Sequence, residues 1–376
     1  MSDRWVLPAR GGSSTQRPAR APSHPLLFAL ILACAACDKD PTSREPVATR
    51  TYRMGFSAIP PTTNQATAVA SLDMWSTRAD AAIMHVDVQW AAMLAGTSAP
   101  AAARANALDL ANYYRAHSLP IVLMLDVTNG LARNQEAPEL VAAGRSITEP
   151  AIQQLYRDYV LAIVDVVRPT YIGLAAETNL IRAAAPRAVY DAVATMTTAA
   201  ANDLRARGIT TPLYVSVQVE TAWGRLAGPG PFTYVGIDDD LRDFPFIGAL
   251  GLSSYPYLGG FATPDDMPTD YYSRLAGTRS LPVMVVEGGW TSGSLGTFQS
   301  SPQMQARYIH RQSELLDAAK AVALFQLTFT DLDLTSIPQP PGSILPLFAA
   351  LGMVDTQLRP KPALAVWDSL YARRLQ

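Results

Sequence analysis

Two glutamates that follow apolar stretches of the chain could do chemistry together. Glu177 comes directly after the short segment 171–176, and Glu287 ends the segment 281–287, the most hydrophobic of its kind in the chain. A carboxylate attached to a buried strand is costly to ionise unless a partner or a polar ligand meets it. Two carboxylates whose pKa values are pushed apart can act as acid and as base or nucleophile, which is what cleavage of a glycosidic bond requires.

The elements that must position these glutamates alternate along the chain from Thr51 onward. We expect strands at residues 52–57, 82–88, 120–126, 171–174, 212–219, 246–253, 281–287 and 322–329. We expect helices at residues 65–79, 100–117, 148–167, 186–207, 302–319 and 362–373, with a short one near 238–242. Strands that are apolar almost throughout are typical of parallel sheets covered by helices. Eight strand–helix units predict one α/β domain, a (β/α)8 TIM barrel; the alternative, a doubly wound open sheet, lacks a glycine-rich phosphate loop here.

In such a barrel the active site lies where the strands end, so polar and aromatic strand-end residues become candidates. Glu177 and Glu287 are the catalytic candidates, although Glu177 could instead form a structural ion pair with Arg182. Candidates for substrate contact are His85, Asp126, Asn179 and Tyr255, together with Trp90, Trp223 and Trp290, whose rings could stack on sugar faces. For the histidine, the tyrosine and the tryptophans, simple core packing is the competing interpretation.

Three short segments carry a resemblance to a known group of enzymes. Residues 172–179 (IGLAAETN), 251–257 (GLSSYPY) and 285–290 (VVEGGW) resemble the segments that end strands four, six and seven in retaining (β/α)8 glycoside hydrolases. Among these enzymes the motifs are most similar to the family 53 endo-β-1,4-galactanases. The resemblance implies that Glu177 is the general acid/base, that Glu287 is the nucleophile, and that Tyr255 donates a hydrogen bond to Glu287. One departure is Ala176, which stands where the group usually has an asparagine that binds the sugar 2-hydroxyl.

Composition excludes several other classes of function. The formal net charge is −2, so the chain offers no basic face for nucleic acid. Two cysteines and four histidines are too few for most zinc or iron–sulfur sites, so we expect no metal and no other cofactor. We expect a monomer.

The N-terminal region is typical of an export signal. Residues 1–25 carry four arginines against one aspartate, and an apolar run of eleven residues at 26–36 follows, too short to span a bilayer. The sequence around Cys34 and Cys37 resembles a bacterial lipoprotein processing site. We therefore expect a lipoprotein-type signal peptide at 1–37, lipidated at Cys37 (or at Cys34), a flexible tether at 38–50 and the barrel at 51–376. An ordinary signal peptide is the alternative.

Together these features predict an enzyme of the cell envelope, lipid-anchored, or secreted if it is not lipidated. It would cleave a β-linked poly- or oligosaccharide by a retaining mechanism that uses two glutamates. The alternative is a non-catalytic, glycan-binding lipoprotein of the same fold, and Ala176 is the observation that favours it.

Overall fold

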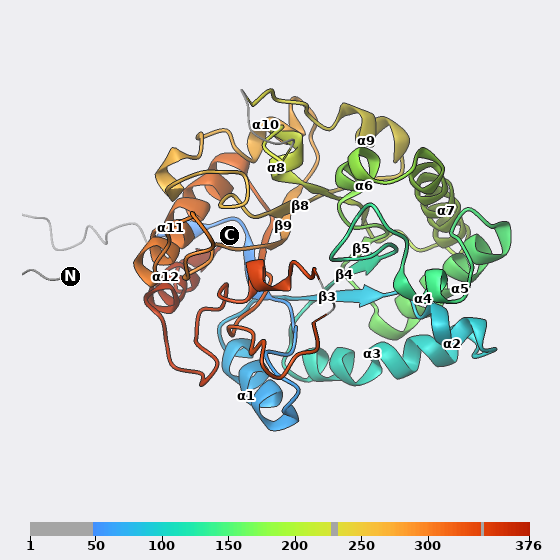
Figure 1. The fold of residues 1–376 in the computed structure, drawn as a ribbon, viewed down its shortest axis with the longest axis horizontal. Helices are drawn as coiled ribbons and strands as arrows, with labels where there is room; N and C mark the ends of the chain where they lie inside the picture. The colour runs from blue at the N-terminus through green and yellow to red at the C-terminus, as the bar shows by residue number, and fades with distance from the viewer. Residues whose placement is uncertain (1–47, 227–231, 340–341) are drawn as a thin grey trace, which may run out of the picture. The chain divides into compact units, whose positions relative to one another are not determined.

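The computed structural model of the chain describes residues 48–226, 232–339 and 342–376, and these form a barrel of parallel strands (Figure 1). Its strands are β2 (Arg53–Phe56), β3 (Ala82–Asp87), β4 (Ile121–Asp126), β5 (Tyr171–Gly173), β6 (Leu213–Tyr214), β7 (Ser216–Gln218), β8 (Leu250–Ser254), β9 (Val283–Gly288) and β10 (Ala323–Gln326). The strands form two hydrogen-bonded sheets, with the orders β3-β4-β5-β6 and β2-β10-β9-β8-β7. A parallel bridge between Ser57 and Ile83 joins β2 to β3 at one junction of the two sheets. At the other junction, β6 continues through Val215 into β7. The predicted eight-unit barrel is thereby confirmed.

Helices surround the barrel, as Figure 1 shows. They are α1 (Gln65–Ser76), α2 (Trp90–Leu94), α3 (Ala99–Ala116), α4 (Pro138–Ala142), α5 (Pro150–Val167), α6 (Thr178–Ala184), α7 (Arg187–Ala206), α8 (Val219–Ala222), α9 (Asp238–Asp243), α10 (Ser273–Ala276), α11 (Pro302–Ala319) and α12 (Pro362–Tyr371), with 3₁₀ turns η1 (Pro264–Asp266) and η2 (Leu345–Phe348). Four of the longest begin with a proline in their first turn, where the missing N–H costs nothing. Within the described part, no helix is long and apolar enough to cross a membrane.

Three predicted strand boundaries were wrong. The strand expected at 212–219 is interrupted at Val215 and gives β6 and β7. The strand expected at 246–253 begins only at Leu250, because Phe246 and Ile247 belong to a turn whose side chains pack on the core. The strand expected at 322–329 ends at Gln326. Apolar residues that pack without joining the ladder look like strand in the sequence.

A tyrosine fills part of the barrel interior. The Tyr214 ring lies against Gly173 and Gly251, where an added Cβ would come within 2.6 Å and 2.9 Å of ring atoms. Its hydroxyl donates to the backbone oxygen of Leu123 at 2.9 Å. Neighbouring strands therefore carry glycine at these points because the ring needs the space, and the interior is packed rather than open.

The two ends of the described chain pair with each other. Strand β1 (Thr49–Arg50) forms a parallel pair with β11 (Arg374–Leu375), and the buried Arg50 side chain binds Asp80 at 2.6 Å. Thr49 and Arg50, which were predicted to belong to the flexible tether at 38–50, are instead held by a strand pair and an ion pair. Residues 38–47 of the predicted tether lie outside the described residues. The predicted signal peptide, with Cys34 and Cys37, lies outside the described residues.

Candidate active site

Glu177 is held at the point where β5 gives way to α6. Its backbone is left-handed, with φ 49° and ψ 48°, a conformation that costs a non-glycine residue about 1–2 kcal/mol. The Ser216 hydroxyl accepts the Glu177 N–H at 2.9 Å and stabilises this conformation. Strain of this kind is frequent where a side chain must be aimed at a reacting group.

Glu287 lies on β9, opposite an irregularity in the neighbouring strand. Leu252 of β8 pairs with Val285, but the next residue, Ser253, pairs with Glu287, so the register shifts between them. Bulges re-aim side chains beside functional sites. Here the shift places the Ser253 hydroxyl beside the Glu287 carboxylate.

The Ser253 hydroxyl bridges the two glutamates. Its oxygen lies 2.7 Å from Oε1 of Glu177 and 3.1 Å from Oε1 of Glu287. The two carboxylate oxygens are therefore at most about 6 Å apart, close to the separation of about 5–5.5 Å that retaining glycosidases use and short of the inverting range. The Tyr255 hydroxyl donates to the same Oε1 of Glu287 at 2.9 Å, as the resemblance implies.

This bridge fits a pair that holds one proton. A serine hydroxyl has a single hydrogen, so it donates to only one carboxylate at a time. Both contacts are hydrogen bonds only when the other glutamate is protonated and donates to the serine oxygen. Two ionised carboxylates at this separation would also repel each other in a buried site. The arrangement thus favours one carboxylic acid and one carboxylate.

Arg133 holds Glu177 from the other side. The loop after β4 turns back at Asn129 and brings the buried Arg133 side chain to the barrel mouth. Its Nε donates to Oε2 of Glu177 at 2.8 Å, and its Nη1 donates to both oxygens of Asp126 at 2.6 and 2.7 Å. The Arg182 partner considered from the sequence was wrong, because Arg182 pairs with Asp239 and Asp240.

Burial dominates the electrostatics of the site. It raises the pKa of both glutamates, while the Arg133 charge opposes the rise in each case. Burial also lowers the pKa of His85 to about 4, so the imidazole is neutral at pH 7. Its Nε2 lies 3.6 Å from Oε2 of Glu287 and makes no ion pair there in that state. Desolvation and the nearby Asp126 raise the pKa of Asp87 to about 6.

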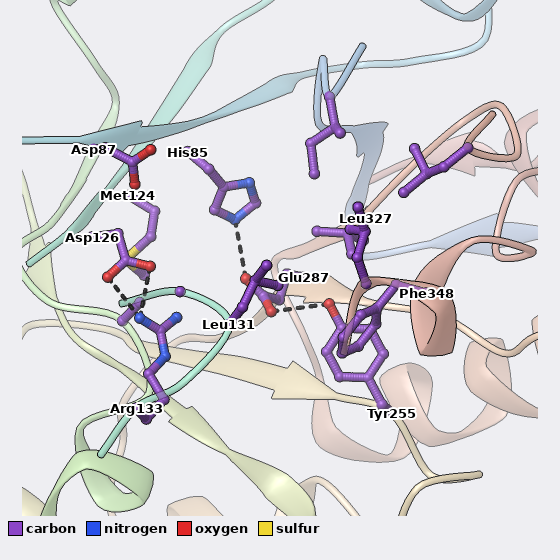
Figure 2. A pocket seen from close by; sticks show the side chains of 15 residues that line it. His85, Asp87, Met124, Asp126, Leu131, Arg133, Tyr255, Glu287, Leu327 and Phe348 are labelled. Carbon is purple, nitrogen blue, oxygen red and sulfur yellow. Dashed lines mark hydrogen bonds and ion pairs between the residues drawn. The ribbon is translucent and has the colours of Figure 1, made fainter. Parts of the chain in front are cut away.

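A cavity of about 300 Å³ opens above Glu287 (Figure 2). Its polar lining comes from His85, Asp87, Asp126, Arg133, Tyr255 and Glu287. Its remaining lining is apolar apart from Gly130: Ile59, Met124, Leu131, Ala176, Leu327, Leu332, Leu345 and Phe348. A second cavity of about 240 Å³ shares Asp87, Asp126, Gly130 and Leu131 with the first, so the two adjoin. Among the described residues, no cluster of His, Cys, Asp or Glu has the geometry to hold a metal ion.

The structure brings five of the sequence candidates together: Glu177, Glu287, Tyr255, His85 and Asp126. Asn179 is not among them. It is buried, and its amide exchanges two hydrogen bonds with the Gln218 backbone, at 2.8 and 2.7 Å, so it cannot replace the missing asparagine. Ala176 itself lines the cavity and offers no side-chain donor.

The three tryptophans lie outside the cavity above Glu287. Trp290 is fully buried, with its ring packed near Phe298 and Tyr308. Trp223 stacks on Tyr271. Trp90 is almost fully buried but borders the second cavity. Packing among aromatic neighbours, rather than a sugar, accounts for the first two.

Sequence reasoning missed Arg133 and Ser253. Arg133 follows a strand-ending aspartate by seven positions, in a loop whose Asn129–Gly130 pair signals a turn back. Ser253 is one of two serines that end the strand LGLSS, and its position alone does not show which glutamate it contacts. Each is a weak signal alone, because only the loop path and the register shift show where the side chains go.

Comparisons with known proteins agree with the fold. An exo-β-1,4-mannosidase from Opitutaceae bacterium strain TAV5 superposes with a TM-score of 0.59 at 15% identity, covering 86% of this chain and 61% of that one. The GH53 catalytic domain of Ignisphaera aggregans superposes with a TM-score of 0.61 at 14% identity, covering 87% of this chain and 100% of that one. GH5_18 from Streptomyces cattleya, in complex with GlcNAc, has a TM-score of 0.60 at 16% identity, covering 87% of this chain and 81% of that one.

At these identities the likeness shows the (β/α)8 barrel fold that the chain shares with glycoside hydrolases. The chain spans less than two thirds of the mannosidase and the whole of the GH53 domain. No protein-family model matches the chain, and no curated protein sequence matches it.

Proposed function

We propose that the protein is a retaining β-glycoside hydrolase, with Glu177 as general acid/base and Glu287 as nucleophile. The observation that carries the proposal is the single Ser253 hydroxyl within hydrogen-bonding distance of both carboxylates. That contact sets a separation suited to a covalent glycosyl intermediate, and it leaves too little room for the water that an inverting enzyme places between its two acids.

The hydrogen-bond chain fits the first chemical step. Protonated Glu177 donates to Ser253, which donates to ionised Glu287, while Tyr255 gives Glu287 a second donor. In the reaction, Glu287 attacks the anomeric carbon and forms an ester, and the Glu177 proton goes to the departing oxygen. Glu177 then takes a proton from water, the water oxygen attacks the same carbon, and Glu287 leaves with its charge restored.

The Arg133 charge beside Glu177 favours the ionised carboxylate, whereas the mechanism needs Glu177 protonated in the first step. The Arg133 Nε donates to Oε2 of Glu177, which leaves Oε1, the oxygen facing Ser253, as the one that carries the proton. The Arg133 charge also sits between Glu177 and Asp126, whose two oxygens accept from Nη1. Asp126 thereby offsets part of the charge that would otherwise keep Glu177 ionised.

For location, we propose attachment to the cell envelope through a lipid on Cys37, with Cys34 as the other candidate. The basic segment, the apolar run and the small residues before Cys37 support this proposal. A β-linked poly- or oligosaccharide outside the cytoplasm is then the substrate class, and a lipid-anchored chain would meet it at the cell surface or in the periplasm.

A second candidate function is glycan binding without catalysis. Two observations favour it: Ala176 offers no group for a sugar hydroxyl, and both oxygens of Glu177 are already bound by Arg133 and Ser253. If Arg133 keeps Glu177 ionised throughout, no acid is present to assist the leaving group.

Azide rescue of two variants tests the roles separately. The wild type should release sugar from a panel of β-glycans (galactan, mannan, glucan, xylan) or aryl β-glycosides, with the first product of retained configuration by NMR. With an activated aryl glycoside, Glu287→Ala plus azide should give the α-glycosyl azide, because azide attacks in place of the nucleophile. Glu177→Ala plus azide should give the β-glycosyl azide, formed from the covalent intermediate.

The opposite outcomes are equally informative. A first product of inverted configuration would contradict the retaining mechanism. Absence of release by a folded wild type, together with measurable glycan binding by calorimetry, would favour the binding protein. If the folded wild type neither releases sugar from any member of the panel nor binds one, both candidate functions are excluded.

A further inference from the structure

The cavity above Glu287 has two chemically different sides. His85, Asp87, Asp126 and Arg133 lie on one side of Glu287, and Leu327 and Phe348 lie on the other, as Figure 2 shows. The apolar wall is defined here as Ile59, Leu327, Leu332, Leu345 and Phe348. It starts directly beside the reacting group, since Phe348 packs edge-on against Tyr255 with ring centroids 4.9 Å apart.

The apolar wall has little to offer a hydroxyl group. None of its five side chains carries a polar atom. The backbone N–H groups of Leu327, Leu332 and Leu345 are used within the protein, by Gly288 O, Ala349 O and Ser343 Oγ respectively. A sugar hydroxyl buried against this wall would lose its bonds to water and gain few in return.

The wall is also fixed in place. The Tyr257 hydroxyl donates to Leu347 O at 2.9 Å, which ties η2 down. Asp331 accepts from Lys361 Nζ at 2.7 Å and from the Gly352 N–H at 2.9 Å, which joins the two ends of the segment that carries η2. The apolar surface is therefore part of the resting cavity and does not need a ligand to form it.

The position of Glu177 decides which part of a substrate meets the wall. In the proposed mechanism the leaving group lies beside the acid, and Glu177 is bound to Arg133, on the polar side. Asp126, the other partner of Arg133, borders the second cavity, which can receive the leaving group. The apolar wall therefore faces the sugar that is transferred to Glu287 and not the leaving group.

We propose that this sugar is a terminal 6-deoxyhexose, which places a methyl group where other hexoses have a hydroxymethyl. A hexopyranose carries its 2- and 3-hydroxyls along one edge and its exocyclic carbon, attached to C5, along the other. The hydroxyl edge matches Asp87, Asp126 and His85, so the exocyclic carbon faces Leu327, Leu345 and Phe348. A volume of about 300 Å³ is at the lower limit for ligand pockets and suits one ring rather than a chain. This inference rests on the proposed function and specifies its substrate.

Matched aryl glycosides test the inference directly. We would measure kcat/KM for p-nitrophenyl β-D-fucoside against β-D-galactoside, β-D-quinovoside against β-D-glucoside, and β-D-rhamnoside against β-D-mannoside. Each pair differs only in CH₃ against CH₂OH at the exocyclic carbon. In the series that the enzyme accepts, the deoxy sugar should be favoured about 10-fold or more, because its partner buries an unpaired hydroxyl.

Two neighbouring variants give a matched control. Leu345→Gln puts a hydrogen-bonding group into the apolar wall and should shift the ratio toward the hydroxymethyl sugar by several-fold. Ile344→Gln changes the exposed neighbour, which does not line the cavity, and should leave the ratio unchanged. Thermal unfolding of both variants shows whether they are folded.

The outcomes separate this inference from the proposed function. Hydrolysis with an equal or greater rate for the hydroxymethyl sugars would overturn the inference and leave the function standing. If no glycoside is hydrolysed, the function fails, and binding of free D-fucose against D-galactose to the wild type decides the inference by calorimetry. Tighter binding of D-fucose would support it, and equal or weaker binding would overturn it.

Discussion

Glu220 follows β7 and Glu287 lies on β9, the two strands on either side of β8, and the surroundings of the two glutamates differ. Glu220 is fully buried and accepts hydrogen bonds from Tyr271 at 2.6 Å, from Ser254 at 3.2 Å and from the Gln218 amide. Glu287 has 16% of its side chain exposed, lines a cavity, and shares its hydroxyl donor with a second carboxylate.

Burial raises the pKa of both residues, so a raised pKa by itself does not distinguish them. What distinguishes Glu287 is empty space above the carboxylate and a second acid on the other side of the same hydroxyl. Glu220 instead has separate donors and packed neighbours. The adjacent residues Ser253 and Ser254 donate to different glutamates, Ser253 at the Glu287 site and Ser254 to Glu220, so each serves as a control for the other.

Neutralising each glutamate in turn tests whether only Glu287 is needed for activity. Glu287→Gln should lower kcat/KM by about 10⁴-fold or more, because it removes the nucleophile. Glu220→Gln should leave the folded enzyme near wild-type activity and lower the free energy of unfolding by about 1–3 kcal/mol, because an amide donor then faces other donors. Initial rates on an aryl glycoside and urea denaturation measure the two effects.

A large loss of activity in folded Glu220→Gln would show that the two sites are not independent. Retained activity in Glu287→Gln would contradict the nucleophile assignment.

Arg133→Gln should have the next largest effect and lower kcat/KM by about 10²-fold. The Arg133 charge lowers the pKa of both Glu177 and Glu287, so its removal should raise both and move the activity profile to higher pH. We would record the pH dependence of kcat/KM for Arg133→Gln and for the double variant with Asp126→Asn, which leaves no unpaired aspartate. The double variant should shift less than the single variant, because the aspartate charge that opposes Arg133 is removed as well. A profile that stays at the wild-type pH in the folded Arg133→Gln variant would contradict the coupling.

Substitutions of the two serines test whether the hydroxyl that bridges Glu177 and Glu287 matters for activity. Ser253→Ala should lower kcat/KM by about 10-fold and change the pH profile, because the bridge between the glutamates is lost. Ser254→Ala should leave both unchanged and destabilise the fold by about 1 kcal/mol, through Glu220. Equal effects of the two substitutions on activity would show that the bridge has no special role.

The smallest expected effect is on the pH dependence of stability. The pKa of Glu287 is raised in the folded protein above its ordinary value of about 4.3. Its contribution to stability is therefore complete below that value and is lost as the pH rises through the folded pKa. Glu287→Gln should match the wild type at pH 4 and unfold about 2–4 °C higher at pH 7. A lower melting temperature than the wild type at pH 7 would contradict this.

Most of the fold could be predicted because its signals are local. Continuous apolar strands such as Ile121–Asp126 and amphipathic helices such as Pro150–Val167 show their type within a few residues. The boundaries near Val215 and Phe246 could not be predicted, because the same apolar residues can join a ladder or pack beside it.

The candidate site could be predicted only for residues that directly follow strands, because these lie together at one face of a (β/α)8 barrel. Glu177, Glu287 and Tyr255 were therefore expected to meet. Arg133 depends on the path of a loop, and the contact of Ser253 depends on a register shift of one residue. Four of the five apolar-wall residues come from the segment after the last barrel strand, whose fold no local pattern specifies.

The pairing of β1 with β11 has a practical consequence. Thr49 and Leu375, at the two ends of this pair, lie beside the start of β2, at the opposite end of the barrel from the strand ends that carry the cavity. A tag, fusion partner or solid support joined after Gln376, or directly before Thr49 in a shortened chain, is therefore attached away from the cavity mouth. Immobilisation at either point would leave the mouth free for substrates in solution.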